Sequence, residues 1–87
     1  MELEQLRIFL AVAGEKSFSR GAGKLYISHS TTSRAVSALE EELGVTLLRR
    51  SNRVLGLTPA GETLAREAEE LLRQAEEIPG RVRETEE

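Results

Sequence analysis

The chain has 87 residues, which is enough for one small domain, and it has no cysteine, which excludes disulfides and thiolate metal sites. Only 3% of the residues are aromatic, so the core must consist mainly of Leu, Val, Ile and Ala. The net charge is −3, but residues 1–58 carry +2 and residues 59–87 carry −5, so the overall acidity does not exclude a nucleic-acid partner for the N-terminal part.

The first predicted element is an amphipathic helix over residues 3–14. Apolar residues recur at helical spacing along one stripe, with Phe9 beside it, and we expect Gly14 to end the helix. Ile8 and Val12 lie on another side, which indicates a second apolar neighbour. The stripe consists of Leu3, Leu6, Leu10 and Ala13.

Two further helices joined by a tight turn are predicted next. Ser17 or Ser19 caps a helix over about residues 19–25, residues 26–28 make the turn, and Ser28 caps the following helix. Gly44 supplies the left-handed stop of that third helix. Its apolar stripe is Thr32, Val36, Leu39 and Leu43, and the opposite side carries Ser30, Ser33, Arg34 and Ser37.

The polar side of this third helix is typical of a helix that docks into the major groove of DNA. Small hydroxyl side chains let the helix backbone approach the bases, and Arg34 can bind guanine through two hydrogen bonds. The sequence therefore predicts a helix-turn-helix over about residues 18–37, with the third helix as the recognition helix.

A hairpin and a long helix complete the chain. Residues 47–50 and 54–57 are predicted strands around the polar turn 51–53, which makes a wing over about residues 47–57. Thr58 and Pro59 then supply a hydroxyl cap and a proline at the first helical position. We expect residues 79–80 to break or kink this last helix, and residues 81–87 to form a frayed polar tail.

The long helix carries a heptad seam. One short helix of the same chain cannot cover a stripe of this length, so we expect the same helix of a second chain to cover it. Packing on the first helix of the same chain is the alternative. The seam consists of Leu64, Ala68, Leu71, Ala75 and Ile78, and Leu72 widens it.

Three segments in this order carry a family resemblance: LRIFLAVAGEKSFSRGAGKL, SRAVSALEEELGVTLLRR and LTPAGETL. From Glu2 to about Ile78 the chain resembles the N-terminal DNA-binding region of LysR-type transcriptional regulators. The resemblance implies a mostly α winged helix-turn-helix, with a three-helix core and a two-stranded hairpin in residues 1–58, followed by a linker and dimerisation helix in residues 59–87. Family members also carry a separate effector-binding domain, so we expect a fragment or a stand-alone DNA-binding unit.

Some positions depart from the family pattern. His29 and Ser30 replace the usual Gln and Pro, which predicts an unusual base preference, and Thr32 replaces a Leu, which predicts weaker packing of the recognition helix. Gly21 and Gly23 replace better helix formers, and each costs about 1 kcal/mol of helix propensity relative to Ala. These changes together predict a less rigid DNA-recognition unit.

The predicted function is sequence-specific binding of an inverted-repeat operator in double-stranded DNA by a homodimer, with wing arginines on phosphates and Arg53 in the minor groove. The alternative is a winged-helix scaffold that dimerises and binds protein instead of DNA. The predicted DNA-binding residues are His29, Ser30, Thr31, Ser33, Arg34, Ser37, Arg49, Arg50 and Arg53.

An enzyme, a metal site and a membrane protein are all disfavoured by the sequence. The chain has no Asp, no Cys and a single His, and it has no glycine-rich phosphate loop. No apolar run approaches a membrane span, and the N-terminus lacks a basic region followed by an apolar stretch, so we expect a cytoplasmic protein without a cofactor. A small-molecule effector would require a further C-terminal domain.

Overall fold

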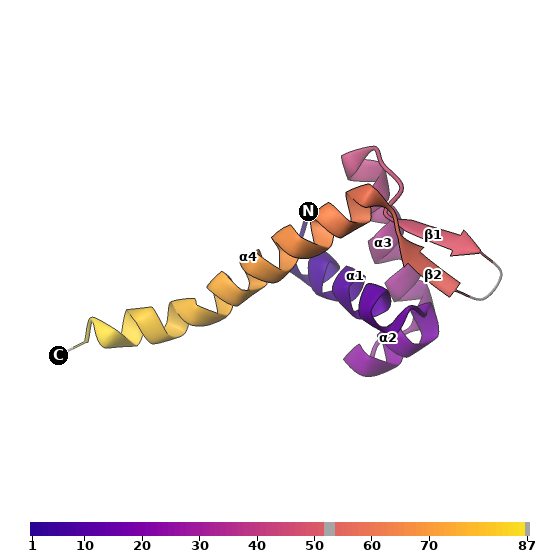
Figure 1. The fold of residues 1–87 in the computed structure, drawn as a ribbon. Helices are drawn as coiled ribbons and strands as arrows, with labels where there is room; N and C mark the ends of the chain where they lie inside the picture. The colour runs from indigo at the N-terminus through magenta and orange to yellow at the C-terminus, as the bar shows by residue number, and fades with distance from the viewer. Residues whose placement is uncertain (52–53, 87) are drawn as a thin grey trace.

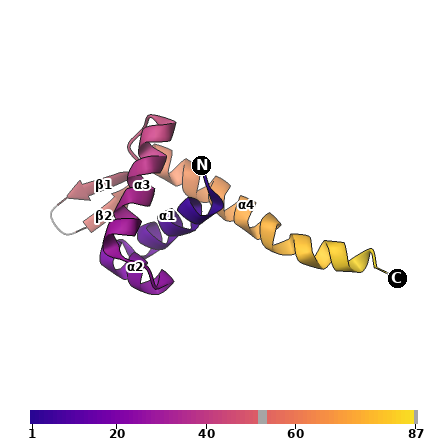
Figure 2. The same cartoon turned by 180° about the vertical axis from the view of Figure 1, so that it is seen from behind.

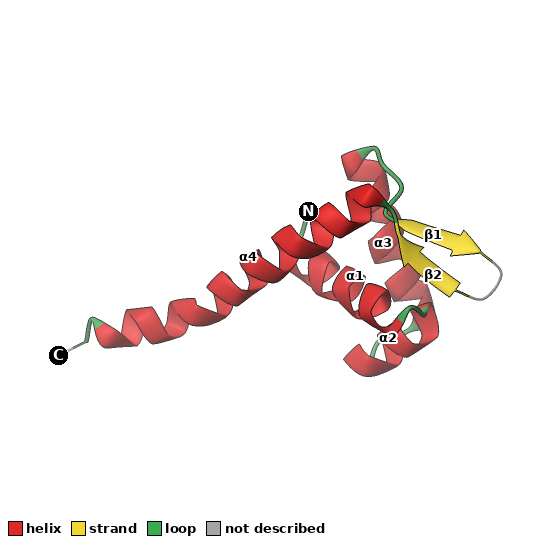
Figure 3. Cartoon of the chain, in the orientation of Figure 1, coloured by secondary structure: helices red, strands yellow, loops and turns green. Residues whose placement is uncertain are grey.

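Three helices, a hairpin and one long helix follow one another in the computed structural model, which describes residues 1–51 and 54–86. Figure 1 shows α1, α2 and α3 gathered at one end, with the hairpin projecting beside them and α4 leaving in the opposite direction. The described residues extend over 56 × 26 × 19 Å, because α4 continues well past the core. Figure 3 shows that helix dominates and that β1 and β2 are the two strands. The fold is therefore the predicted winged helix-turn-helix followed by a long helix.

Helix α1 (Leu3–Glu15) supplies the centre of the core. Leu6, Phe9 and Val12 are fully buried, and Ile8 is nearly so, which confirms that both sides of α1 have apolar neighbours. Leu3, expected on the buried stripe, is exposed at the first turn.

The end of α1 differs from the prediction. Gly14 does not stop the helix; Lys16 adopts the left-handed conformation with φ of 54° and caps it one residue after Glu15. Gly14 lies inside the helix, where an added Cβ would meet open space. The end of α1 thus depends on a lysine in the strained left-handed conformation and not on Gly14, which could adopt that conformation without strain.

Helix α2 (Phe18–Leu25) begins one residue earlier than predicted, with Ser17 as its cap. The Ser17 hydroxyl accepts a hydrogen bond from the backbone N–H of Arg20 at 3.1 Å. An added Cβ at Gly21 would lie 2.9 Å from the Cα of Val12, so this glycine permits the close approach of α2 to α1. No atom lies within 4 Å of the corresponding position at Gly23, so only Gly21 has a packing reason to lack a side chain.

Helix α3 (His29–Leu43) packs across α1 and α2, and it is capped by Ser28 as predicted. Thr32 is fully buried, and its hydroxyl donates a 2.9 Å hydrogen bond to the carbonyl of Ser28. This bond satisfies the hydroxyl that replaces the leucine usual in the family. Gly44 ends the helix with φ of 69°, as expected, whereas Leu43 is exposed and does not belong to the buried stripe.

Strands β1 (Leu48–Ser51) and β2 (Val54–Leu57) pair antiparallel, with Leu48 opposite Leu57 and Arg50 opposite Leu55. The hairpin begins one residue later than predicted, because Leu47 is a fully buried core residue outside the strand and Ser51 belongs to β1. Residues 52–53 of the predicted turn, including Arg53, lie outside the described residues.

Helix α4 (Pro59–Glu84) is fixed to the core through its first turn. The Thr58 hydroxyl accepts from the N–H of Gly61 at 3.0 Å and donates to the carbonyl of Thr46 at 2.6 Å, which confirms the predicted cap. An added Cβ at Gly61 would lie 2.1 Å from the carbonyl oxygen of Leu47, so only glycine fits there.

The proximal half of α4, Pro59–Leu72, packs on α1. Ala68 and Leu72 are buried in the same core cluster as Leu6 and Phe9, and Leu64 packs against it. Two residues of the expected seam are therefore covered within the chain, by the alternative packing on the first helix.

The distal half, Arg73–Glu84, continues past the core. Pro79 and Gly80 do not break the helix, and residues 81–84 are helical and not frayed as expected. Proline removes one backbone donor, but the exposed helix curves without ending, as the ribbon in Figure 1 shows. No helix among the described residues is long and apolar enough to cross a membrane.

Candidate nucleic-acid interface

The N-terminus of α3 is a cluster of hydroxyl groups around Ser28. The Ser28 hydroxyl accepts from the N–H of Thr31 at 3.1 Å, donates to the Thr31 hydroxyl at 2.8 Å and lies 3.2 Å from the hydroxyl of Ser30. All three side chains are exposed. These contacts fix the first turn of the helix, so the cap, Ser30 and Thr31 present one ordered polar surface.

The polar face continues along α3 as the spacing predicted. Ser30, Arg34 and Ser37 are exposed, and Ser33 is half-buried beside them. Among the described residues, no ion pair involves Arg34. Its guanidinium therefore lies on the outer face of the helix without a carboxylate partner in the described part of the chain.

The hairpin arginines do not share one face. Arg49 and Arg50 are neighbours in β1 and both are exposed, but successive side chains of a strand point to opposite faces. The Arg50 Cζ lies 4.6 Å from the centroid of the Phe18 ring, at the start of α2. Arg50 thus faces the helix-turn-helix, and Arg49 points to the other side of the hairpin.

His29, the first residue of α3, also lies at this surface. Its ring is exposed, and its centroid lies 5.9 Å from that of Phe18, with an angle of 46° between the planes. Phe18 therefore lies between the wing and the recognition helix. The sequence pattern assigned Phe18 no role at this surface; its place directly after the capping Ser17, at the first position of α2, was the available signal.

Glu40 is a second residue that sequence reasoning missed. One of its carboxylate oxygens accepts from the N–H of Leu47 at 2.8 Å and from that of Leu48 at 3.4 Å. These bonds hold the root of the hairpin against α3. The signal was its spacing, since Glu40 follows the buried Val36 by one helical turn.

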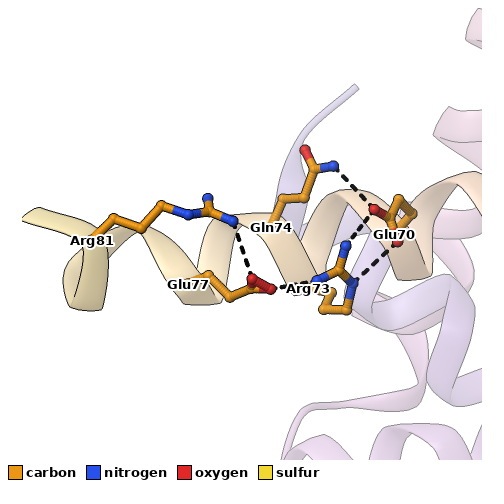
Figure 4. A network of polar contacts seen from close by, with 5 residues as sticks. All are labelled: Glu70, Arg73, Gln74, Glu77 and Arg81. Carbon is orange, nitrogen blue, oxygen red and sulfur yellow. Dashed lines mark hydrogen bonds and ion pairs between the residues drawn. The ribbon is translucent and has the colours of Figure 1, made fainter.

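Seven glutamates lie on α4, whereas the three glutamates of α3 lie in its C-terminal part, at residues 40–42. Figure 4 shows Arg73 between Glu70 and Glu77, with Gln74 bonded to Glu70 and Arg81 bonded to Glu77. Hydrogen bonds from Arg73 and then Gln74 lower the pKa of the Glu70 carboxyl. The carboxylates of this network are thus paired with arginines of the same helix.

The elements of the candidate interface lie next to one another. Figure 2, seen from behind, shows α3 between the hairpin and α1, with α2 crossing below it.

The model of the bacterial regulatory helix-turn-helix proteins of the lysR family matches residues 3–62, which include α1 to β2 and the start of α4. The chain belongs to the LysR family.

Relatives and solved structures of the LysR family agree with the geometry. The HTH-type transcriptional regulator BenM of Acinetobacter baylyi is 42% identical over 78 residues, which cover 90% of this chain and 26% of BenM. A crystal structure of the BenM DNA-binding domain with benA site 1 DNA has a TM-score of 0.94 at 38% identity and covers 99% of this chain and 100% of that one.

The CbnR DNA-binding domain bound to DNA has a TM-score of 0.91 at 38% identity, with 95% of each chain covered. The present chain spans about a quarter of the length of the curated relatives it matches.

Proposed function

We propose that this chain is the DNA-binding part of a LysR-type transcription regulator, which binds double-stranded DNA with α3 in the major groove. The observation that carries the proposal is the exposed polar face of α3, on which Arg34 has no ion pair within the described residues. Solved structures of two relatives with DNA support it. The role is one of binding and not of catalysis, in the cytoplasm.

Each predicted residue has a role in this proposal. Arg34 reads a guanine through two hydrogen bonds, and the hydroxyls of Ser33 and Ser37 let the backbone approach the bases. His29, Ser30 and Thr31 contact the DNA at the entry of the helix into the groove. Arg49 and Arg50 bind phosphates on the two sides of the wing, and Arg53 enters the minor groove.

In this proposal residues 1–58 are the DNA-recognition unit, and residues 59–87 are the linker and dimerisation helix through which two chains assemble. Apolar side chains left exposed on α4 support a partner chain: Leu71 is 43% exposed, Ile78 is 53% exposed, and Val82, in line with them, is 60% exposed. Leu64 and Ala75 border this strip. A two-fold dimer places two copies of α3 on one duplex, so the operator is an inverted repeat.

The test is the base preference of Arg34→Ala, measured on an operator selected from a random duplex pool. Loss of two hydrogen bonds to one guanine lowers affinity by about 1–3 kcal/mol and relaxes the preference at one base pair per half-site. Arg83→Ala is the matched control, because it removes the same charge from the far end of α4, where Arg83 is exposed. An equal loss on all sequences identifies Arg34 as a phosphate contact and overturns its assignment.

Salt dependence tests the proposal independently. Binding that displaces counterions from phosphates weakens steeply between about 50 and 200 mM salt. A wild-type chain that binds no duplex at low salt, but still dimerises, would contradict the proposal and favour a protein-binding scaffold.

A further inference from the structure

Three elements of the proposed interface meet at one aromatic ring. Phe18 is the first residue of α2, Arg50 lies in β1 and His29 is the first residue of α3. The Arg50 Cζ lies 4.6 Å from the ring centroid, and the His29 ring centroid lies 5.9 Å from it. Phe18 itself is half-buried and packs against the core. The ring is thus anchored on the inside and contacted by two exposed polar residues on the outside.

Both contacts are of an attractive kind. A guanidinium within about 6 Å of a ring centroid is drawn to the negative π-face, and tilted aromatic pairs at about 4.5–7 Å are favourable. Neither contact neutralises a charge. Among the described residues no carboxylate pairs with Arg50, so the Phe18 ring, and not an ion pair, limits where its guanidinium can lie.

We infer that Phe18 is a positioning residue for DNA binding: its ring sets the distance between the wing guanidinium of Arg50 and the imidazole of His29. This inference rests on the proposed function, in which His29 enters the major groove and Arg50 binds a phosphate. Glu40 holds the root of the hairpin, and Leu48, Leu55 and Leu57 pack its inner face on the core. The contact between Arg50 and Phe18 restrains the hairpin further along β1.

The consequence is that the contribution of Phe18 to DNA binding is energetically coupled to the contribution of Arg50. A long arginine side chain on an exposed strand has many rotamers, and ordering it on DNA costs entropy. An arginine already held on a ring has less to lose when it binds a phosphate. The benefit of the Phe18 ring should therefore depend on the presence of Arg50.

A double-mutant cycle on the selected operator tests this coupling, with Phe18→Leu and Arg50→Gln alone and together. Leucine keeps an apolar side chain in the core but has no π-face, and Gln removes the charge. We expect Phe18→Leu to weaken binding about 3- to 5-fold in the wild-type background, and less than 2-fold in the Arg50→Gln background. Phe18→Tyr keeps the ring and should bind as the wild type does.

A measurement without DNA separates the inference from the proposed function. In nuclear magnetic resonance spectra of the free chain, the ring current of Phe18 shifts the side-chain protons of Arg50 and His29, and Phe18→Leu should abolish both shifts. If Phe18→Leu is too unstable to study, the ring-current shifts of Arg50 and His29 in the wild type, and their retention in Phe18→Tyr, carry the test.

The outcomes are distinct. A wild-type chain that binds no duplex refutes the proposed function. A wild-type chain that binds duplex, with additive losses in the cycle or unshifted Arg50 resonances, refutes the positioning role of Phe18 and leaves DNA binding intact.

Discussion

The two halves of α4 have the same secondary structure but differ in what they pack against. In the proximal half, Ala68 and Leu72 are buried against α1, and the first turn is locked by Thr58. The distal half carries a surface network centred on Arg73, with exposed apolar side chains at Ile78 and Val82. One helix is thus a core element for half its length and an exposed arm for the rest.

This difference shows why a helical pattern alone does not identify a partner. Leu71 and Leu72 are adjacent in sequence, yet Leu72 is buried in its own chain and Leu71 is exposed. A step of one residue rotates the side chain by about 100° around the helix axis, which is enough to change the surface that it meets. Substitutions in the proximal half should therefore change folding, and those on the exposed strip should change assembly.

The largest expected effect is on assembly. Leu71→Arg places an unpaired charge twice in the proposed two-fold seam, so the dimer should weaken by more than about 3 kcal/mol while the helical content of the monomer stays unchanged. Light scattering and duplex titration measure the two properties. Glu69→Arg, on the opposite side of α4, is the control and should remain dimeric. A Leu71→Arg chain that is still dimeric and fully competent to bind DNA rules out the seam.

The next effect is on folding. Gly61→Ala forces a Cβ against the carbonyl oxygen of Leu47, at 2.1 Å in the present backbone, so we expect a loss of about 3 kcal/mol in the free energy of unfolding. Gly80→Ala, in the distal half, meets no atom within 4 Å and should gain at most about 1 kcal/mol locally. Urea denaturation at fixed protomer concentration compares them, and equal behaviour of the two variants contradicts the comparison.

Leu72→Ala should destabilise the fold by about 2 kcal/mol, at the lower end for a buried leucine because Leu72 lies at the edge of the core. Leu71→Ala is the matched control, and at concentrations where the chain is monomeric it should change the free energy of unfolding by less than about 0.5 kcal/mol. Similar losses from both variants would mean that α4 lies against the core in another rotation.

Pro79→Ala restores the missing backbone donor and removes a residue unfavourable to helices. The distal half makes few contacts with the core, so the gain should remain local: slower amide hydrogen exchange in residues 75–84, with the global free energy of unfolding changed by less than about 0.5 kcal/mol. A global gain approaching about 3 kcal/mol would show that the two halves unfold as one unit.

The smallest effect is on pH dependence. The pKa of Glu70 is lowered in the folded chain by Arg73 and Gln74, so its contribution is present above the unfolded pKa of a glutamate and is lost as the pH falls through the folded value. Because Glu70 is fully exposed, we expect only a slight loss of distal helicity in acid, measured by circular dichroism, and a smaller one in Glu70→Gln. An unchanged acid response in Glu70→Gln assigns the loss to other carboxylates.

The elements of the fold were predictable because local signals mark them. Ser28, Thr58 and Gly44 act as the caps that their residue types predict. The predicted helix boundaries were wrong at two places. Gly14 was expected to end α1, but the helix ends at the left-handed Lys16. Pro79 was expected to break or kink α4, but it lies inside a curved, exposed helix that continues past it.

The candidate site was only partly predictable. The exposed face of α3 followed from helical spacing, since Ser30, Arg34 and Ser37 need only the geometry of one helix. Helical spacing places Glu40 on the side of α3 that carries Val36, but it does not identify the hairpin root as the partner of Glu40, nor Arg50 as the partner of Phe18, because these contacts join different elements. Tertiary contacts of this kind depend on how α2 and β1 meet, which the sequence pattern does not specify.

Thr58 joins the start of α4 to the root of the wing. It is the single residue between β2 and α4, and its backbone N–H and hydroxyl both bond to the segment that enters β1, at Leu47 and Thr46. With no spare residue to act as a hinge, the start of α4 and the root of the hairpin are held as one joint. A displacement of the first turn of α4 relative to α1 is therefore expected to move the root of the wing with it.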